Sequence, residues 1–164
     1  MKWSKQKKII EDRICDNLKK RISINLTNYR AIHEPESRFW ITYDGKEIIS
    51  ISKMQWLNEW VKIRKEYKES NGTENEYDYA TNVMQNNGDY YINDILYSLY
   101  QYLNLSIDEA LTSENFIIKA LSMIDKRLGK RRLITMVLDE KEHPLVKKLY
   151  KIRCDIEKID GINC

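Results

Sequence analysis

Glycine, proline and long apolar runs are scarce in this sequence, and each shortage excludes a class of protein. Only 5 Gly and 2 Pro occur among 164 residues, which excludes a low-complexity or loop-rich chain and favours long helices. No apolar run approaches the roughly 18 residues of a membrane-spanning helix, so we expect no membrane partner. The lysines near the N-terminus precede no apolar stretch, so we expect no signal peptide.

Residues that could carry chemistry are also few. The odd number and wide spacing of the cysteines predict reduced thiols in a cytoplasmic protein: Cys15, Cys154 and Cys164. Two histidines and scattered cysteines supply no zinc-ligand spacing, and no phosphate-binding, dinucleotide-binding or nucleophile-elbow motif occurs. We therefore expect no metal, no cofactor and no catalytic residue, and an enzyme is the third choice of function class.

His33 has neighbours that suggest chemistry. It stands beside Glu34 and Glu36 in a predicted loop, and a histidine paired with a carboxylate can act as a general base. A loop hydrogen bond or simple surface exposure explains the same residues. The other histidine, His143, precedes Pro144 at a predicted helix start, where capping explains it.

Charge is segregated along the chain although the net charge is only +3. Residues 1–21 carry eight Lys or Arg against three Asp or Glu, and residues 126–153 carry ten against three. Residues 66–116 carry ten acidic residues against a single lysine. Two interpretations stay open. Either the acidic middle lies against the basic ends inside the fold, or the basic ends form an exposed face that meets phosphate.

The first part of the chain shows two kinds of hydrophobic spacing. Residues 2–20 carry an apolar stripe at helical spacing, which predicts an amphipathic helix. Residues 22–27 alternate apolar with polar, as a half-buried strand does. Residues 53–69 return to helical spacing, with Trp56 and Trp60 on one stripe.

A hairpin is predicted between these two helices. Asp44-Gly45 separates two β-rich runs, 39–43 and 46–52, and a type I′ turn needs positive φ at both central positions. Three consecutive strands with short connections predict an antiparallel meander, and we expect both flanking helices to bury their stripes on its one apolar face. That face should hold Phe39 and Ile41 opposite Ile49 or Ile51.

The second part of the chain is predicted to be helical after a polar start. Residues 70–79 are polar and aperiodic, which indicates a linker, and a weak helix over 79–86 should end at Asn87-Gly88. Residues 89–103 carry a strong helical stripe, whereas 130–138 are ambiguous.

Capping residues mark the remaining helices. Ser106 begins a capping box with Glu109, and Ser113 is predicted to cap the helix that follows. Gly129 is predicted to follow the end of that helix, and Pro144 fits the first position of the last one.

These elements predict an α+β fold. With 42% hydrophobic and 32% charged residues, the composition is that of a globular chain. We expect an N-terminal α-β-β-β-α layer over 1–69 with a three-stranded antiparallel meander, a linker and weak helix over 70–88, and a helical C-terminal half over 89–164. The last should dock on the first to make one unit.

A basic run and a set of tyrosines are the candidate functional surfaces. The run has five cations among seven residues: Lys126, Arg127, Lys130, Arg131 and Arg132. Such a run can contact phosphate. Alternatively, a helix C-terminus, whose dipole favours cations, explains some of these residues. Seven of the 11 tyrosines lie within 77–102. Of these, Tyr97 and Tyr100 fall off the apolar stripe of their helix and suggest a protein interface or internal packing.

The element order of residues 2–69 resembles that of a double-stranded-RNA-binding domain. The resemblance lies in the segment YRAIHEPESRFWITYDGKEIISISK, residues 29–53, with its histidine between the first two strands. It implies that His33 contacts an RNA minor groove and that Ser52-Lys53 lies at the start of a helix that binds phosphate. Met54 and Leu57 depart from the pattern, because further lysines are expected there.

The whole chain resembles an uncharacterised family of short bacterial cytosolic proteins. The matching segments are MKWSK at 1–5, WITYDGKEI at 40–48, LNLSIDEAL at 103–111, DKRLGKRRL at 125–133 and EHPLVKKLYKIRC at 142–154. The resemblance implies a single architecture and a bacterial cytoplasm, and adds no site.

The function that the sequence favours is a non-enzymatic binding or regulatory module. It would act through a protein partner or self-association, with Tyr97 and Tyr100 as interface residues. The alternative is binding of structured RNA or DNA through a basic face, using His33 together with the basic run.

Overall fold

The α+β prediction is confirmed by the computed structural model, which describes residues 2–28 and 37–159. Within these ranges no helix has the length and apolar content needed to cross a bilayer. The elements follow in chain order: α1 (Trp3–Arg13), a short 3-10 helix η1 (Asp16–Leu18), β1 (Ile22–Asn28), β2 (Ser37–Tyr43), β3 (Lys46–Ser52), α2 (Lys53–Glu69), α3 (Glu76–Asn86), α4 (Ile92–Asn104), α5 (Ile107–Leu111), α6 (Phe116–Met123), α7 (Lys130–Thr135) and α8 (Pro144–Glu157).

The three strands form the predicted antiparallel meander in the order β1-β2-β3. Asp44 and Gly45 both have positive φ, at 48° and 76°, as a type I′ turn requires. Phe39 pairs with Ile51 and Ile41 pairs with Ile49, which confirms the predicted shared face.

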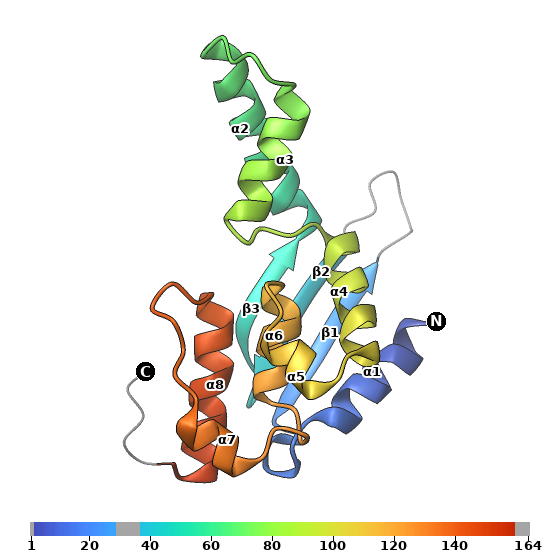
Figure 1. Cartoon of the computed structure of the whole chain (residues 1–164). Helices are drawn as coiled ribbons and strands as arrows, with labels where there is room; N and C mark the ends of the chain where they lie inside the picture. The colour runs from blue at the N-terminus through green and yellow to red at the C-terminus, as the bar shows by residue number, and fades with distance from the viewer. Residues whose placement is uncertain (1, 29–36, 160–164) are drawn as a thin grey trace.

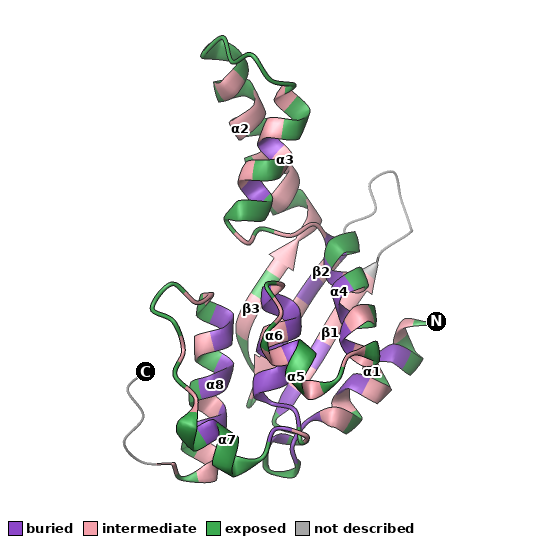
Figure 2. Ribbon diagram, viewed as in Figure 1, coloured by how far each residue is buried: buried purple, intermediate pink, exposed green. Residues whose placement is uncertain are grey.

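Helices cover the apolar face of this sheet. α1 packs on β1, α4 packs on β2 and on α1, and α6 lies between α4 and α8 (Figure 1). The buried residues concentrate in this helix layer and on the facing strands (Figure 2). One core therefore joins the N-terminal sheet to the C-terminal helices.

The pair α2 and α3 projects from this body as an arm (Figure 1). The expectation that α2 buries its stripe on the sheet is wrong, because α2 has no buried residue. Its aromatic side chains face α3 instead: Tyr67 stacks on Tyr79 with ring centroids 3.8 Å apart, and Trp60 lies against Tyr77 at 5.7 Å. Aromatic stacking thus replaces burial on the sheet.

The predicted linker is shorter than expected. Residues 76–79 are helical, because the side chain of Asn75 accepts hydrogen bonds from the backbone N–H groups of Tyr77 and Asp78 and caps α3. The loop between α2 and α3 wraps the Tyr67 ring, whose hydroxyl accepts a hydrogen bond from the Glu74 N–H at 2.9 Å. Because of this cap, a helix begins inside the polar segment, where hydrophobic periodicity does not predict one.

The first helix also ends earlier than predicted. α1 ends at Arg13, and Ile14 forms an antiparallel bridge with Asp125. The Cys15 N–H donates to the Ile124 carbonyl at 2.9 Å, and the Lys126 N–H donates to the Arg13 carbonyl at 2.7 Å. Pairing with a distant segment satisfies these backbone groups and replaces the next helical turn.

The caps of the later helices are partly as predicted. Ser106 and Glu109 form the expected capping box of α5, and His143 caps α8 with Pro144 in its first turn. Asn115, not Ser113, caps α6, and its side chain accepts from two backbone N–H groups. Gly129 does not follow a helix: it is the N-cap of α7, with φ at −74°.

We predict that Gly45→Val lowers the free energy of unfolding by about 1–2 kcal/mol, because a β-branched residue resists the positive φ of this turn. Thermal or urea unfolding measures the change. Gly45→Asn is the matched control and should lose less, since asparagine tolerates positive φ. Equal stability of the valine variant and the wild type would contradict the turn assignment.

Candidate functional site

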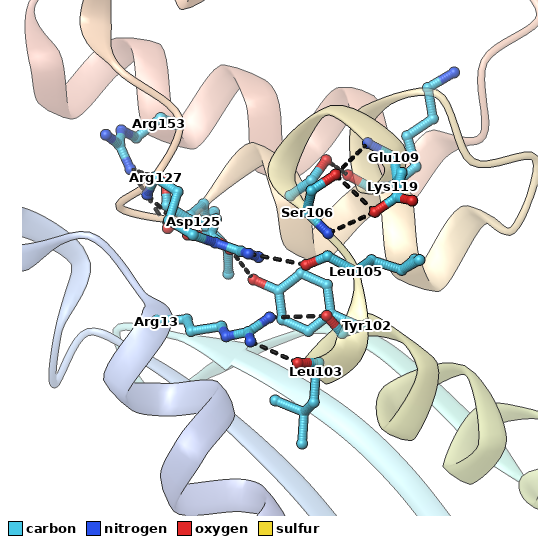
Figure 3. A network of polar contacts seen from close by, with 12 residues as sticks. Arg13, Tyr102, Leu103, Leu105, Ser106, Glu109, Lys119, Asp125, Arg127 and Arg153 are labelled. Carbon is cyan, nitrogen blue, oxygen red and sulfur yellow. Dashed lines mark hydrogen bonds and ion pairs between the residues drawn. The ribbon is translucent and has the colours of Figure 1, made fainter.

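A buried polar network surrounds Asp125, which is 0% exposed. The Tyr102 hydroxyl donates to Asp125 Oδ2 at 2.5 Å, and Arg127 Nη2 lies 2.7 Å from the same oxygen (Figure 3). Arg127 also donates through Nη1 to the Leu105 carbonyl at 2.9 Å. The network therefore uses one cation of the basic run to neutralise an internal carboxylate.

Arg13 extends this network to the N-terminal helix. Its guanidinium donates to the Tyr102 carbonyl at 2.8 Å and to the Leu103 carbonyl at 2.6 Å, at the C-terminal end of α4 (Figure 3). A cation there complements the negative end of the helix dipole. Burial, and then the charge of Asp125, raise the pKa of Tyr102 above its ordinary value, so the hydroxyl stays protonated as a donor.

The other cations of the basic run divide into paired and exposed ones. Arg132 forms an ion pair with Asp108, and Lys130 donates to the Glu157 carbonyl at 2.7 Å. The side chains of Lys126 and Arg131 are exposed and make no hydrogen bond or ion pair with the described residues. Lys130, Arg131 and Arg132 begin α7, whereas Lys126 and Arg127 lie in the turn before it. The preceding helix, α6, already ends at Met123, so the expectation that the run lies at a helix C-terminus is wrong.

The two histidines differ in what the structure describes. His33 lies outside the described residues. His143 Nδ1 accepts the Leu145 N–H at 3.1 Å, and its ring stacks on Phe116 with centroids 3.9 Å apart. Burial lowers the pKa of His143, so neutral imidazole serves as this cap.

Tyr97 and Tyr100 lie on the outer side of α4, with 62% and 52% of their surface exposed. The opposite side of the helix is buried through Ile95, Leu99 and Tyr102. The two tyrosines share a shallow groove, and among the described residues no charged side chain lines it. We call its residues the tyrosine surface: Tyr97, Tyr100, Gln101, Asn104, Leu105, Ser113, Asn115 and Ile118.

The floor of the tyrosine surface is held in place by hydrogen bonds. Asn115 Nδ2 donates to the Ser98 hydroxyl at 2.8 Å, and that hydroxyl donates to the Asp94 carbonyl at 2.6 Å. Asn115 also caps α6, so its side chain has little freedom. The groove is thus built on rigid helices, while its two tyrosines stay accessible.

A second concave site lies where the arm leaves the body, and we call it the arm cleft. It has a cavity volume of about 150 Å³ and is open to solvent. The end of β3, the first turns of α2 and the link between α3 and α4 line it, with Trp56, Glu59, Met84, Asp89 and Tyr90 among its walls.

Sequence reasoning missed the arm cleft. Trp56 and Asp89 are 33 positions apart, yet the Trp56 indole N–H donates to the Asp89 carbonyl at 2.9 Å. Trp56 also meets Tyr91 edge to face, with centroids 5.1 Å apart. The aromatic residues of 53–69 and 77–102 could have indicated this contact. Aromatic side chains in excess of one helix stripe need a partner elsewhere in the fold.

The comparisons with known proteins identify the chain at the level of a family. The family's model matches residues 2–154, from the first residues of α1 into α8. The chain belongs to the SF0329 protein family. No curated protein matches the chain, and no solved structure matches it. The expected membership of a family is thus confirmed over residues 2–154, and this range includes the Asp125 network, the tyrosine surface and the arm cleft.

We predict that Tyr102→Phe flattens the alkaline loss of stability. A raised folded-state pKa gives stability that is fully present below the ordinary tyrosine pKa near 10 and is lost as pH rises above it. Between pH 9 and 11 the variant should lose about 1.4 kcal/mol less than the wild type. Urea unfolding at each pH measures this. Tyr97→Phe, which alters an exposed hydroxyl, should keep the wild-type profile.

Proposed function

We propose that this protein is a non-enzymatic binding module that contacts another polypeptide, either a partner or a second copy of itself, through the tyrosine surface. The observation that carries the proposal is the exposure of Tyr97 and Tyr100 side by side on a rigid helix. Tyrosine offers a large amphipathic contact area with only two side-chain torsions to order, so it binds at low entropic cost.

The residues around the two tyrosines support this proposal. Amides and hydroxyls from Gln101, Asn104 and Ser113 line the same groove as Leu105 and Ile118. A mixture of tyrosine, small polar groups and a few apolar side chains is typical of adaptable protein-binding surfaces. None of the described residues that line this groove is charged, which favours a neutral polypeptide surface over a phosphate-bearing one.

The proposal includes a bacterial cytoplasmic setting. The family resemblance implies it, and Cys15 supports it as a buried thiol whose pKa is raised by that burial. A raised pKa disfavours the reactive thiolate, so the side chain acts as a small apolar core residue, which suits a reducing compartment.

The combined change Tyr97→Ala and Tyr100→Ala should weaken the interaction about tenfold or more, because truncated interface tyrosines often cost over 1 kcal/mol each. The fold should stay within about 0.5 kcal/mol of the wild type, since both side chains are exposed. Light scattering over a range of concentrations tests self-association. A photoreactive phenylalanine at position 97, cross-linked in cells, tests for a partner.

Val137 is the matched control position, because it is 91% exposed and lies away from the tyrosine surface. A discrete adduct from position 97 but not from position 137 supports the proposal, and its mass separates a second copy from a partner. A monomer at every concentration, with equal cross-linking from both positions, would contradict it.

Nucleic-acid binding is the second candidate, and it is favoured by the exposed side chains of Lys126 and Arg131, which make no hydrogen bond or ion pair with residues 2–28 and 37–159. The resemblance to a double-stranded-RNA-binding domain adds Ser52, which caps α2, and Lys53, its first residue, to this candidate. His33 and the remaining cations of the run belong to this alternative.

Under this second candidate, Lys126→Ala with Arg131→Ala should weaken binding to duplex DNA and structured RNA. Each lost phosphate contact should reduce the salt slope by roughly 0.7–0.9. Lys65→Ala, on the arm, is the control. If the wild type shifts no duplex in a gel at near-physiological salt and micromolar protein, nucleic-acid binding is excluded.

A further inference from the structure

The arm cleft has aromatic and apolar walls that are fixed by contacts of their own. The Trp56 indole is held by its hydrogen bond to the Asp89 carbonyl and by stacking on Trp60, with centroids 6.1 Å apart. Tyr90 leans on Phe116 at 4.9 Å, and Met84 is buried at the back of the cleft. A ligand would therefore meet a preformed surface rather than order it.

Two acidic residues line the same cleft from different elements. Glu59 comes from α2 and Asp89 from the link between α3 and α4. Burial raises the pKa of Asp89, and the nearby charge of Glu59 raises it further. Two like charges beside a partly enclosed space repel each other, and a cation placed between them relieves that repulsion.

Among the described residues, the only lysine or arginine paired with either acid is Lys62, whose Nζ lies 3.3 Å from the Glu59 carboxylate. Both side chains of this pair are about half exposed, so solvent screens the pair and a cation in the cleft can displace it. His143 acts on Asp89 only at a distance, and burial lowers its pKa, so it is neutral near pH 7. No lysine or arginine is among the residues that line the cleft.

We propose that the arm cleft binds an organic cation, a primary ammonium or guanidinium group on a short alkyl chain. Glu59 and Asp89 would take the charge, the face of Trp56 or Tyr90 would add a cation–π contact, and Met84 would contact the alkyl part. The cation comes from either a free diamine or a lysine or arginine side chain of a peptide. This site is separate from the tyrosine surface and goes beyond the proposed function.

The test is a titration of the ¹⁵N-labelled full chain with 1,4-diaminobutane, followed by NMR. The Trp56 indole N–H should shift saturably, because it lies in the wall of the cleft. The neutral isostere 1,4-butanediol should cause no saturable shift. Absence of a saturable shift with the diamine, or equal shifts with both compounds, would overturn the proposal.

Charge-neutral variants assign the binding to the cleft. Glu59→Gln and Asp89→Asn should each weaken diamine binding about fivefold or more, since each removes one charge of the pair. Glu66→Gln is the matched control on α2, exposed and outside the cleft, and should bind like the wild type. Equal weakening by all three variants would indicate only a diffuse charge effect and would refute a specific site. Glu59→Gln alone is decisive if Asp89→Asn does not fold.

A second titration separates the two sources of the cation. N-acetyl-lysine methylamide presents the same ammonium group on a peptide backbone. Tighter binding of this compound than of the diamine assigns the cleft to a basic side chain, and the reverse order assigns it to a free diamine. If the cleft does not bind the cation, the proposal for the tyrosine surface still stands, because none of the described residues lines both sites.

Discussion

The contacts of one buried carboxylate, that of Asp125, join α1 to the C-terminal helices. A charge with no exposed surface costs several kcal/mol unless it is paired and hydrogen-bonded. Tyr102 and Arg127 meet that need, and the backbone around Asp125 pairs with Ile14 and its neighbours. The helix layer is therefore attached to α1 at a polar junction as well as through the apolar core.

Three of the five cations of the basic run make contacts within the fold. Arg127 neutralises Asp125, Arg132 pairs with Asp108, and Lys130 binds a carbonyl at the end of α8. The segregated charges thus meet in part inside one fold, through the pair between Arg132 and the acidic segment. The two proposed binding surfaces lie elsewhere, on the outer side of α4 and at the base of the arm.

The arm illustrates how one helix can follow its sequence pattern and still contradict the expected packing. The predicted bounds of α2, 53–69, are confirmed. Its tryptophan and tyrosine stripe meets the tyrosines of α3, however, and not the sheet. Amphipathic spacing indicates which side of a helix is covered, but it does not identify what covers it. The arm cleft forms because α2 packs against α3 and not along the sheet, and hydrophobic periodicity could not predict this packing.

Features that depend only on neighbouring residues could be predicted from the order of the amino acids. The Asp44-Gly45 turn, the capping box at Ser106 and the Pro144 helix start are set by backbone preferences within a few positions. In contrast, the end of α1, the burial of Asp125 and the contact between Trp56 and Asp89 depend on how the chain packs. Each of these depends on a contact between segments far apart in the chain, and only the folded packing decides which of many compatible partners is used.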